Sequence, residues 1–100
     1  MTARLSIDGD ALSALCRRHH VRRLSLFGSV MKGTARAGSD VDFLVEFAAG
    51  KEPGLMGLAA MEAELSAVLG GRLVDLRTAE DLSEQFRNEV IRTAEVQYAA

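Results

Sequence analysis

The apolar residues of this chain follow two different spacings, which divide it into helices and strands. Spacings of three and four residues, which place side chains on one face of a helix, run through residues 8–20, 55–69 and 82–93. Asp8 is suitably placed to cap the first of these helices, and Gly70-Gly71 ends the second. The third segment has weaker spacing and is compatible with one or two helices. We therefore predict at least three helices.

Strand-like alternation is clearest over residues 41–47. It directs four apolar side chains toward a core, namely Val41, Phe43, Val45 and Phe47. It directs the residues between them away from that core, namely Asp42, Leu44 and Glu46. Shorter apolar runs predict further strands over residues 24–27, 73–76 and 95–98.

The connections complete the predicted order of elements. Residues 29–32 can form one helical turn, and residues 33–39 and 48–53 are predicted loops. Thr78 and Asp81 resemble a capping box before the third helical segment. Helices and strands thus alternate, which predicts an α/β (α+β) fold in which a small mixed sheet is flanked by helices.

Composition limits the classes of protein to consider. The chain has 100 residues, 48% of them hydrophobic, which predicts a single globular domain over residues 1–100. A net charge of −2 gives no general attraction to nucleic acid or to an anionic membrane. A single cysteine, Cys16, excludes an internal disulfide, and neither a signal peptide nor a membrane span is recognisable. We expect a cytoplasmic protein.

The first candidate site is a pair of carboxylates at the start of the 41–47 strand. Asp40 and Asp42 are two residues apart, and the period of a strand places both on one face. Hard cations such as Mg²⁺ prefer carboxylate and phosphate oxygens. The same spacing also occurs by chance on the solvent-exposed face of a strand. An EF-hand is excluded, because Leu44, Val45 and Lys51 stand where its ligand, glycine and closing glutamate are needed.

The second candidate site is the Gly28-Ser29 pair after the predicted 24–27 strand. Glycine lets the backbone approach a phosphate closely, and the following N–H groups and the Ser29 hydroxyl can bind the anion. No Lys followed by Ser or Thr completes a Walker A loop. Taken alone, a glycine at this place is usually only a turn.

Together, the two candidate sites resemble a known signature. The segments Leu26-Phe27-Gly28-Ser29-Val30-Met31-Lys32-Gly33 and Ser39-Asp40-Val41-Asp42-Phe43-Leu44-Val45 resemble the DNA polymerase β-like nucleotidyltransferase superfamily, in its minimal nucleotidyltransferase (MNT) branch. The resemblance implies catalytic and metal-binding roles for Asp40, Asp42 and a third carboxylate, Asp75. It implies nucleotide-binding roles for five residues, namely Gly28, Ser29, Lys32, Gly33 and Ser39. Met31-Lys32 departs from the Ala-Arg that is frequent in the family.

The resemblance also implies an activity and a partner. A member of this branch is expected to bind ATP and Mg²⁺ and to transfer AMP to a partner protein. That partner is expected to be a helical HEPN protein in a toxin–antitoxin pair, with this chain as the antitoxin. A single small domain is expected to need surface from that partner or from a second copy of the chain. The alternative is a non-catalytic antitoxin or scaffold, and a small-molecule nucleotidyltransferase fits less well, because such enzymes carry an additional domain.

The remaining features have ordinary explanations. A basic cluster includes Arg17, Arg18, His19, His20, Arg22 and Arg23. It is typical of a solvated helix C-terminus, although contact with RNA, nucleotide or an acidic partner is an alternative. Cys16 lies on the apolar face of the first helix and is expected in the core, and Met56 and Met61 are expected in the core or an interface. Tyr98 is expected to be exposed or half-buried, with self-modification as an alternative.

Overall fold

The computed structural model describes residues 7–28 and 40–100 of the chain. Its elements are α1 (Gly9–Arg18), β1 (Val21–Phe27), β2 (Val41–Phe47), α3 (Leu55–Val68), β3 (Val74–Arg77), the 3₁₀ turn η1 (Ala79–Asp81), α4 (Glu84–Thr93) and β4 (Glu95–Ala99). The predicted helical turn and loop over residues 29–39 lie outside the described residues. All the other predicted elements are present, and the third helical segment, predicted over residues 82–93, corresponds to α4, which η1 precedes.

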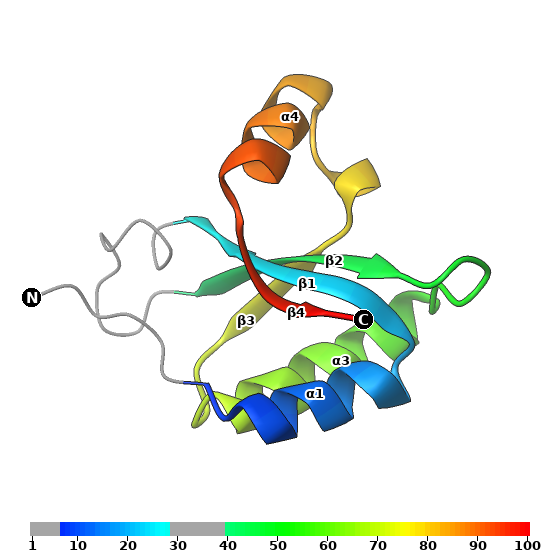
Figure 1. The fold of residues 1–100 in the computed structure, drawn as a ribbon, viewed down its shortest axis with the longest axis vertical. Helices are drawn as coiled ribbons and strands as arrows, with labels where there is room; N and C mark the ends of the chain where they lie inside the picture. The colour runs from blue at the N-terminus through cyan, green and yellow to red at the C-terminus, as the bar shows by residue number, and fades with distance from the viewer. Residues whose placement is uncertain (1–6, 29–39) are drawn as a thin grey trace, which may run out of the picture.

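The strands form one mixed sheet in the order β3-β2-β1-β4 (Figure 1). β1 is antiparallel to β2 and β4, whereas β2 and β3 are parallel. α3 connects the two parallel strands, as a crossover between parallel neighbours requires. The predicted fold class, a small mixed sheet flanked by helices, is confirmed.

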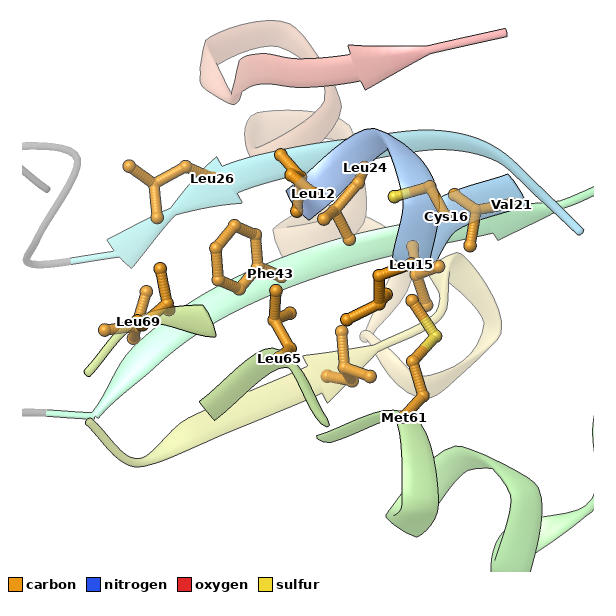
Figure 2. Packing of buried hydrophobic residues seen from close by; sticks show 13 residues of the cluster. Leu12, Leu15, Cys16, Val21, Leu24, Leu26, Phe43, Met61, Leu65 and Leu69 are labelled. Atoms are coloured by element: carbon orange, nitrogen blue, oxygen red, sulfur yellow. The ribbon is translucent and has the colours of Figure 1, made fainter. Parts of the chain in front are cut away.

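The main hydrophobic core lies on the face of the sheet that α1 and α3 cover (Figure 1). α1 contributes Leu12, Leu15 and Cys16 to this core, and α3 contributes Met61 and Leu65 (Figure 2). The sheet contributes apolar residues from β1, β2 and β3, namely Val21, Leu24, Leu26, Val41, Phe43, Val45 and Leu76. The predicted inward set of β2 is therefore confirmed, with Phe47 packed at the margin of the core. Burial also raises the pKa of the Cys16 thiol to about 11.

The opposite face of the sheet carries α4 and a much smaller apolar cluster (Figure 1). Its buried members are Phe27, Leu44, Leu82 and Val90. Leu44 points away from the main core, as predicted, but it is buried in this second cluster and only 3% exposed, which was not expected. α4 packs over this face, so the sheet is covered on both sides. Alternation of apolar and polar residues along a strand predicts a sheet with only one covered face.

The first helix and strand differ from their predicted limits. The Asp8 side chain caps α1 by accepting hydrogen bonds from the N–H groups of Asp10 (3.0 Å) and Ala11 (3.3 Å), as predicted. The helix ends at Arg18, two residues earlier than predicted, and His20 turns the chain with a φ of +58°. β1 then begins at Val21 rather than at residue 24.

The basic cluster is consequently divided between two elements. Arg17 and Arg18 occupy the last turn of α1, as predicted, but Arg22 and Arg23 lie on β1. Both β1 arginines form ion pairs with Glu46 of β2, at 3.1 and 3.6 Å. The explanation of the whole cluster as a helix C-terminus was therefore wrong for its second half.

A polar contact links α1 to α3 at the edge of the main core. Glu64 accepts a hydrogen bond from Arg18 at 2.5 Å and lies 2.7 Å from Nε2 of His19. These two contacts hold the pKa of Glu64 below its usual value, the Arg18 bond being the larger cause. We call this set of three residues the Glu64 contact.

The remaining expectations have mixed outcomes. α3 ends before Gly70 and Gly71, whose φ values of +74° and +93° confirm the predicted stop. Met61 is buried as expected, whereas Met56 is 88% exposed and does not belong to the core of this chain. Tyr98 is half-buried against the main core, in agreement with the simpler expectation. Within residues 7–28 and 40–100, no helix is long and apolar enough to cross a bilayer.

Candidate functional site

Parallel pairing brings two of the predicted acids together. The register of β2 and β3 sets Asp42 directly beside Asp75. The register of β1 and β2 sets Phe27 on the other side of Asp42, and Gly28 follows immediately. A carboxylate pair therefore lies next to the end of β1, as the separate motifs predicted.

Gly28 occupies this place because a side chain does not fit. Its φ is +82°, in the left-handed region that glycine adopts most easily. A Cβ atom built at Gly28 would overlap Oδ2 of Asp42 and lie 3.1 Å from its Cγ. Glycine thus allows the backbone after β1 to lie against the Asp42 carboxylate, and this is the place where the predicted phosphate loop begins.

Asp75 is held by an arginine on its own strand. Oδ2 of Asp75 accepts a hydrogen bond from Nε of Arg77 at 3.1 Å and lies 3.0 Å from Nη2 of the same residue. The two residues are two positions apart on β3, so their side chains lie on one face of the sheet. Arg77 therefore partly neutralises the carboxylate pair.

Asp42 has an unfavourable environment for its negative charge. Burial is the main cause that raises its pKa above the ordinary value, and the charges of Asp75 and then Asp40 raise it further. The charge of Arg77 acts in the opposite direction and is the smallest of these causes. All three predicted acids are thus electrostatically coupled. A concentration of carboxylate charge that one arginine only partly balances favours binding of a cation.

Asp42 and Asp75, but not Asp40, line a cleft of about 350 Å³. The residues that line it are Phe27, Gly28, Asp42, Asp75, Arg77, Asp81, Leu82, Ser83 and Phe86. Leu82 and Phe86 also line it, and Phe86 packs edge-on against Phe27 with 6.4 Å between the ring centres. The cleft therefore combines carboxylates with an aromatic pair.

The structure describes only part of the predicted site. Ser29, Lys32, Gly33 and Ser39 lie outside the described residues. Asp40 is exposed just before β2. Among residues 7–28 and 40–100, no three histidine, cysteine or acidic side chains lie close enough together to hold a metal ion. The structure thus brings Asp42, Asp75 and Gly28 together, and the complete set of ligands remains a prediction.

Two residues of the cleft were not singled out from the sequence. Arg77 could have been noticed because it follows Asp75 by one strand period, which predicts that the two side chains share a face. Phe86 could have been noticed only as a large aromatic residue in the first turn of a helix. Its position in the cleft depends on how α4 packs over the sheet, and no local pattern in the sequence encodes that.

Comparisons with known proteins agree with this geometry. The family model described as "Nucleotidyltransferase domain" matches residues 10–97. The chain belongs to the nucleotidyltransferase domain family. It is accordingly an enzyme of the nucleotidyltransferase class, and its resemblance to minimal nucleotidyltransferases is confirmed.

Individual relatives support the same assignment. The protein adenylyltransferase MntA of Thermococcus cleftensis is 39% identical over 78 residues, which make up 78% of this chain and 76% of the relative. A candidate protein adenylyltransferase of Methanocaldococcus jannaschii, MJ0435, is 35% identical over 77 residues, or 77% of this chain and 80% of the relative.

Solved structures confirm the fold of this nucleotidyltransferase. A candidate minimal nucleotidyltransferase matches with a TM-score of 0.70 and 38% identity, over 86% of this chain and 85% of that protein. A toxin–antitoxin crystallised with AMP-PNP matches with a TM-score of 0.73 over 94% of this chain and 75% of that one. Its identity is 20%, so this second likeness concerns the fold alone.

Proposed function

We propose that this nucleotidyltransferase uses ATP and Mg²⁺ to transfer AMP to a helical HEPN-type partner protein, as the antitoxin of a toxin–antitoxin pair. The observation that carries the proposal is the placement of Asp42 beside Asp75, with Gly28 against the Asp42 carboxylate. Paired carboxylates suit a metal, and a glycine with open backbone suits a phosphate. A nucleoside triphosphate with its metal needs both.

The donor set fits Mg²⁺. Asp42 and Asp75 offer hard oxygen ligands from neighbouring strands, and Asp40 contributes to the same negative potential. When bound, the metal would supply positive charge to the phosphate at which transfer occurs. The raised pKa of Asp42 reflects burial and repulsion that a bound cation would relieve.

The residues of the chain would then bind and orient the reactants. Gly28 and Ser29 would hold the triphosphate, with Lys32, Gly33 and Ser39 completing that loop. Asp75 would accept the proton of the attacking hydroxyl. The hydroxyl oxygen forms a bond to the α-phosphorus as the bond between the α- and β-phosphates breaks, and pyrophosphate leaves with the bonding electrons.

The identity of the acceptor is inferred from relatives. Two proteins with at least 35% identity carry the name protein adenylyltransferase, and one of them is MntA. Solved complexes of MntA with HepT share the fold of this chain. We therefore favour a protein acceptor over a small molecule, and a HEPN-type partner over an unrelated protein.

The test is transfer of label to the partner. The chain and the HEPN-type protein encoded beside it are incubated with α-labelled ATP and Mg²⁺, using wild type, Asp42→Ala and the matched control Asp10→Ala. Asp10 lies in the first turn of α1, away from the cleft. We expect label on the partner with wild type and Asp10→Ala but not with Asp42→Ala. Full neutralisation of the partner by Asp42→Ala, with no label in any sample, would contradict the proposal and favour a non-catalytic antitoxin.

A further inference from the structure

The contact between Arg77 and Asp75 has a specific geometry. Both Nε and Nη2 of Arg77 approach the same oxygen, Oδ2, at 3.1 and 3.0 Å. The side chain of Arg77 is 48% exposed and that of Asp75 is 34% exposed. An exposed ion pair between neighbours on one strand contributes little to stability. A contribution to the stability of the fold therefore does not explain why an arginine stands here.

The charges that line the cleft are unequal. Its described lining residues include three carboxylates, from Asp42, Asp75 and Asp81, and one cation, from Arg77. Asp81 already accepts hydrogen bonds at 3.1 Å from the N–H and the hydroxyl of Thr78. Asp42 and Asp75 are the two carboxylates left for Arg77 to balance, and its charge acts on both.

Arg77 and a divalent metal would compete for the same carboxylate. A cation held by Asp42 and Asp75 would supply the positive charge that the guanidinium otherwise supplies. Arg77 is long, half-exposed and lines the same cleft as Gly28, where the triphosphate is proposed to bind. A guanidinium released from a carboxylate is well suited to phosphate, because its planar donors can contact two oxygens at once.

We propose that Arg77 is a positioning residue whose guanidinium changes partner, from the carboxylate of Asp75 to the phosphate of the nucleotide. It holds Asp75 while the metal is absent, and it binds phosphate oxygens of the nucleotide once metal occupies the carboxylates. This inference rests on the proposed function. It predicts that removal of Arg77 changes two affinities in opposite directions. The metal alone should bind more tightly, and the nucleotide in the presence of metal should bind more weakly.

The test measures binding, without turnover, by titration calorimetry. The probes are Mn²⁺ alone and α,β-methylene-ATP in the presence of saturating Mn²⁺. The proteins are wild type, Arg77→Ala, Arg77→Lys and the control Arg22→Ala, which removes an exposed arginine paired with Glu46 at 3.1 Å. For Arg77→Ala we expect Mn²⁺ to bind roughly two- to fivefold more tightly. We expect the nucleotide analogue to bind about tenfold more weakly.

The control variants define the result. Arg77→Lys keeps the charge and loses the planar fork, so Mn²⁺ binding should stay near wild type while nucleotide binding weakens. Arg22→Ala should change neither affinity. Unchanged or weaker Mn²⁺ binding by Arg77→Ala would overturn the inference while leaving the proposed function intact. Failure of wild type to bind Mn²⁺ with nucleotide would instead overturn the proposed function, and this inference with it.

Discussion

The two faces of the sheet differ in what they bury. Among the described residues, the cluster between α1, α3 and the sheet contains thirteen buried residues of one continuous apolar core. The cluster on the α4 side contains four, and Asp42, Asp75 and Arg77 lie on that side too. β1 and β2 serve both faces, because successive residues of a strand point to opposite sides. In this small fold, the large apolar core that stabilises it and the cluster of charged side chains thus lie on opposite faces of the sheet.

The charges on the two faces also differ in their partners. Glu64, at the edge of the main core, has a lowered pKa because Arg18 and His19 contact its carboxylate. Asp42, on the opposite face, has a raised pKa because it is buried beside other carboxylates. The contacts of Glu64 favour its anionic form, whereas burial and neighbouring carboxylates disfavour the anionic form of Asp42. The contrast separates an acid with cationic partners from the acid to which we assign a role in the proposed reaction.

The largest expected effect compares one leucine from each face. Leu65 is fully buried in the main core, and Leu82 is 8% exposed in the small cluster. Leu65→Ala should lower the free energy of unfolding by about 2–5 kcal/mol, because it leaves a cavity in a closely packed region. Leu82→Ala should cost roughly half as much, since fewer atoms surround it. Urea denaturation of both variants measures the difference. Equal losses would contradict the view that the face under α1 and α3 contributes more to stability.

The next effect concerns the backbone at Gly28. In Gly28→Ala the new Cβ would overlap the Asp42 carboxylate, so we expect transfer activity to fall about a hundredfold through displacement of that ligand. Gly50→Ala is the matched control, because Gly50 has a similar φ of +76° and no atom within 4 Å of an added Cβ. Both variants should lose roughly 1–2 kcal/mol of stability from the positive φ.

Label transfer and thermal unfolding, measured together, separate these two contributions. Equal loss of activity in Gly28→Ala and Gly50→Ala would show that strain alone is responsible. It would remove the argument that Gly28 makes room for the acid.

The smallest effect is the pH dependence of the Glu64 contact. Because the folded-state pKa of Glu64 is lowered from 4.5, its contribution is present above that pH and is lost as the pH falls through the folded value. Glu64→Gln should therefore reduce the free energy of unfolding by less than about 1 kcal/mol at pH 7. The difference from wild type should disappear in strongly acidic solution. A difference that persists or grows there would contradict this sign.

Local patterns in the sequence predicted much of the fold. The alternation over β2 gave its limits and its inward residues, and the Asp8 cap and the Gly70-Gly71 stop were also correct. Gly28 and Asp42 were selected by residue type and spacing and Asp75 by the family resemblance, and the sheet register brings the three together. These predictions succeeded because strand period, helix caps and glycine conformation are local properties.

The errors came from contacts between distant elements. Leu44 points away from the main core as predicted, but its burial was missed, because α4 covers it from more than thirty residues away in the chain. Arg22 and Arg23 were assigned to a helix terminus, but they lie on β1, which pairs with β2, and both contact Glu46 of that strand. Phe86 joins the cleft only through the packing of α4 over the sheet, whereas Arg77 contacts Asp75 two residues away on the same strand and was simply overlooked. No short segment encodes such contacts.

The central claim is that the α4 face performs the chemistry while the α1 and α3 face holds the fold. Asp42→Asn tests it most directly, when the free energy of unfolding and the initial rate of AMP transfer are measured on the same preparation. The raised pKa means that the charge of Asp42 costs stability as the pH rises through the folded value. At pH 7 we therefore expect a free energy of unfolding equal to or above that of wild type, with transfer at least about a hundredfold slower. Transfer at the wild-type rate, or a loss of stability that accounts for the loss of activity, would contradict the claim.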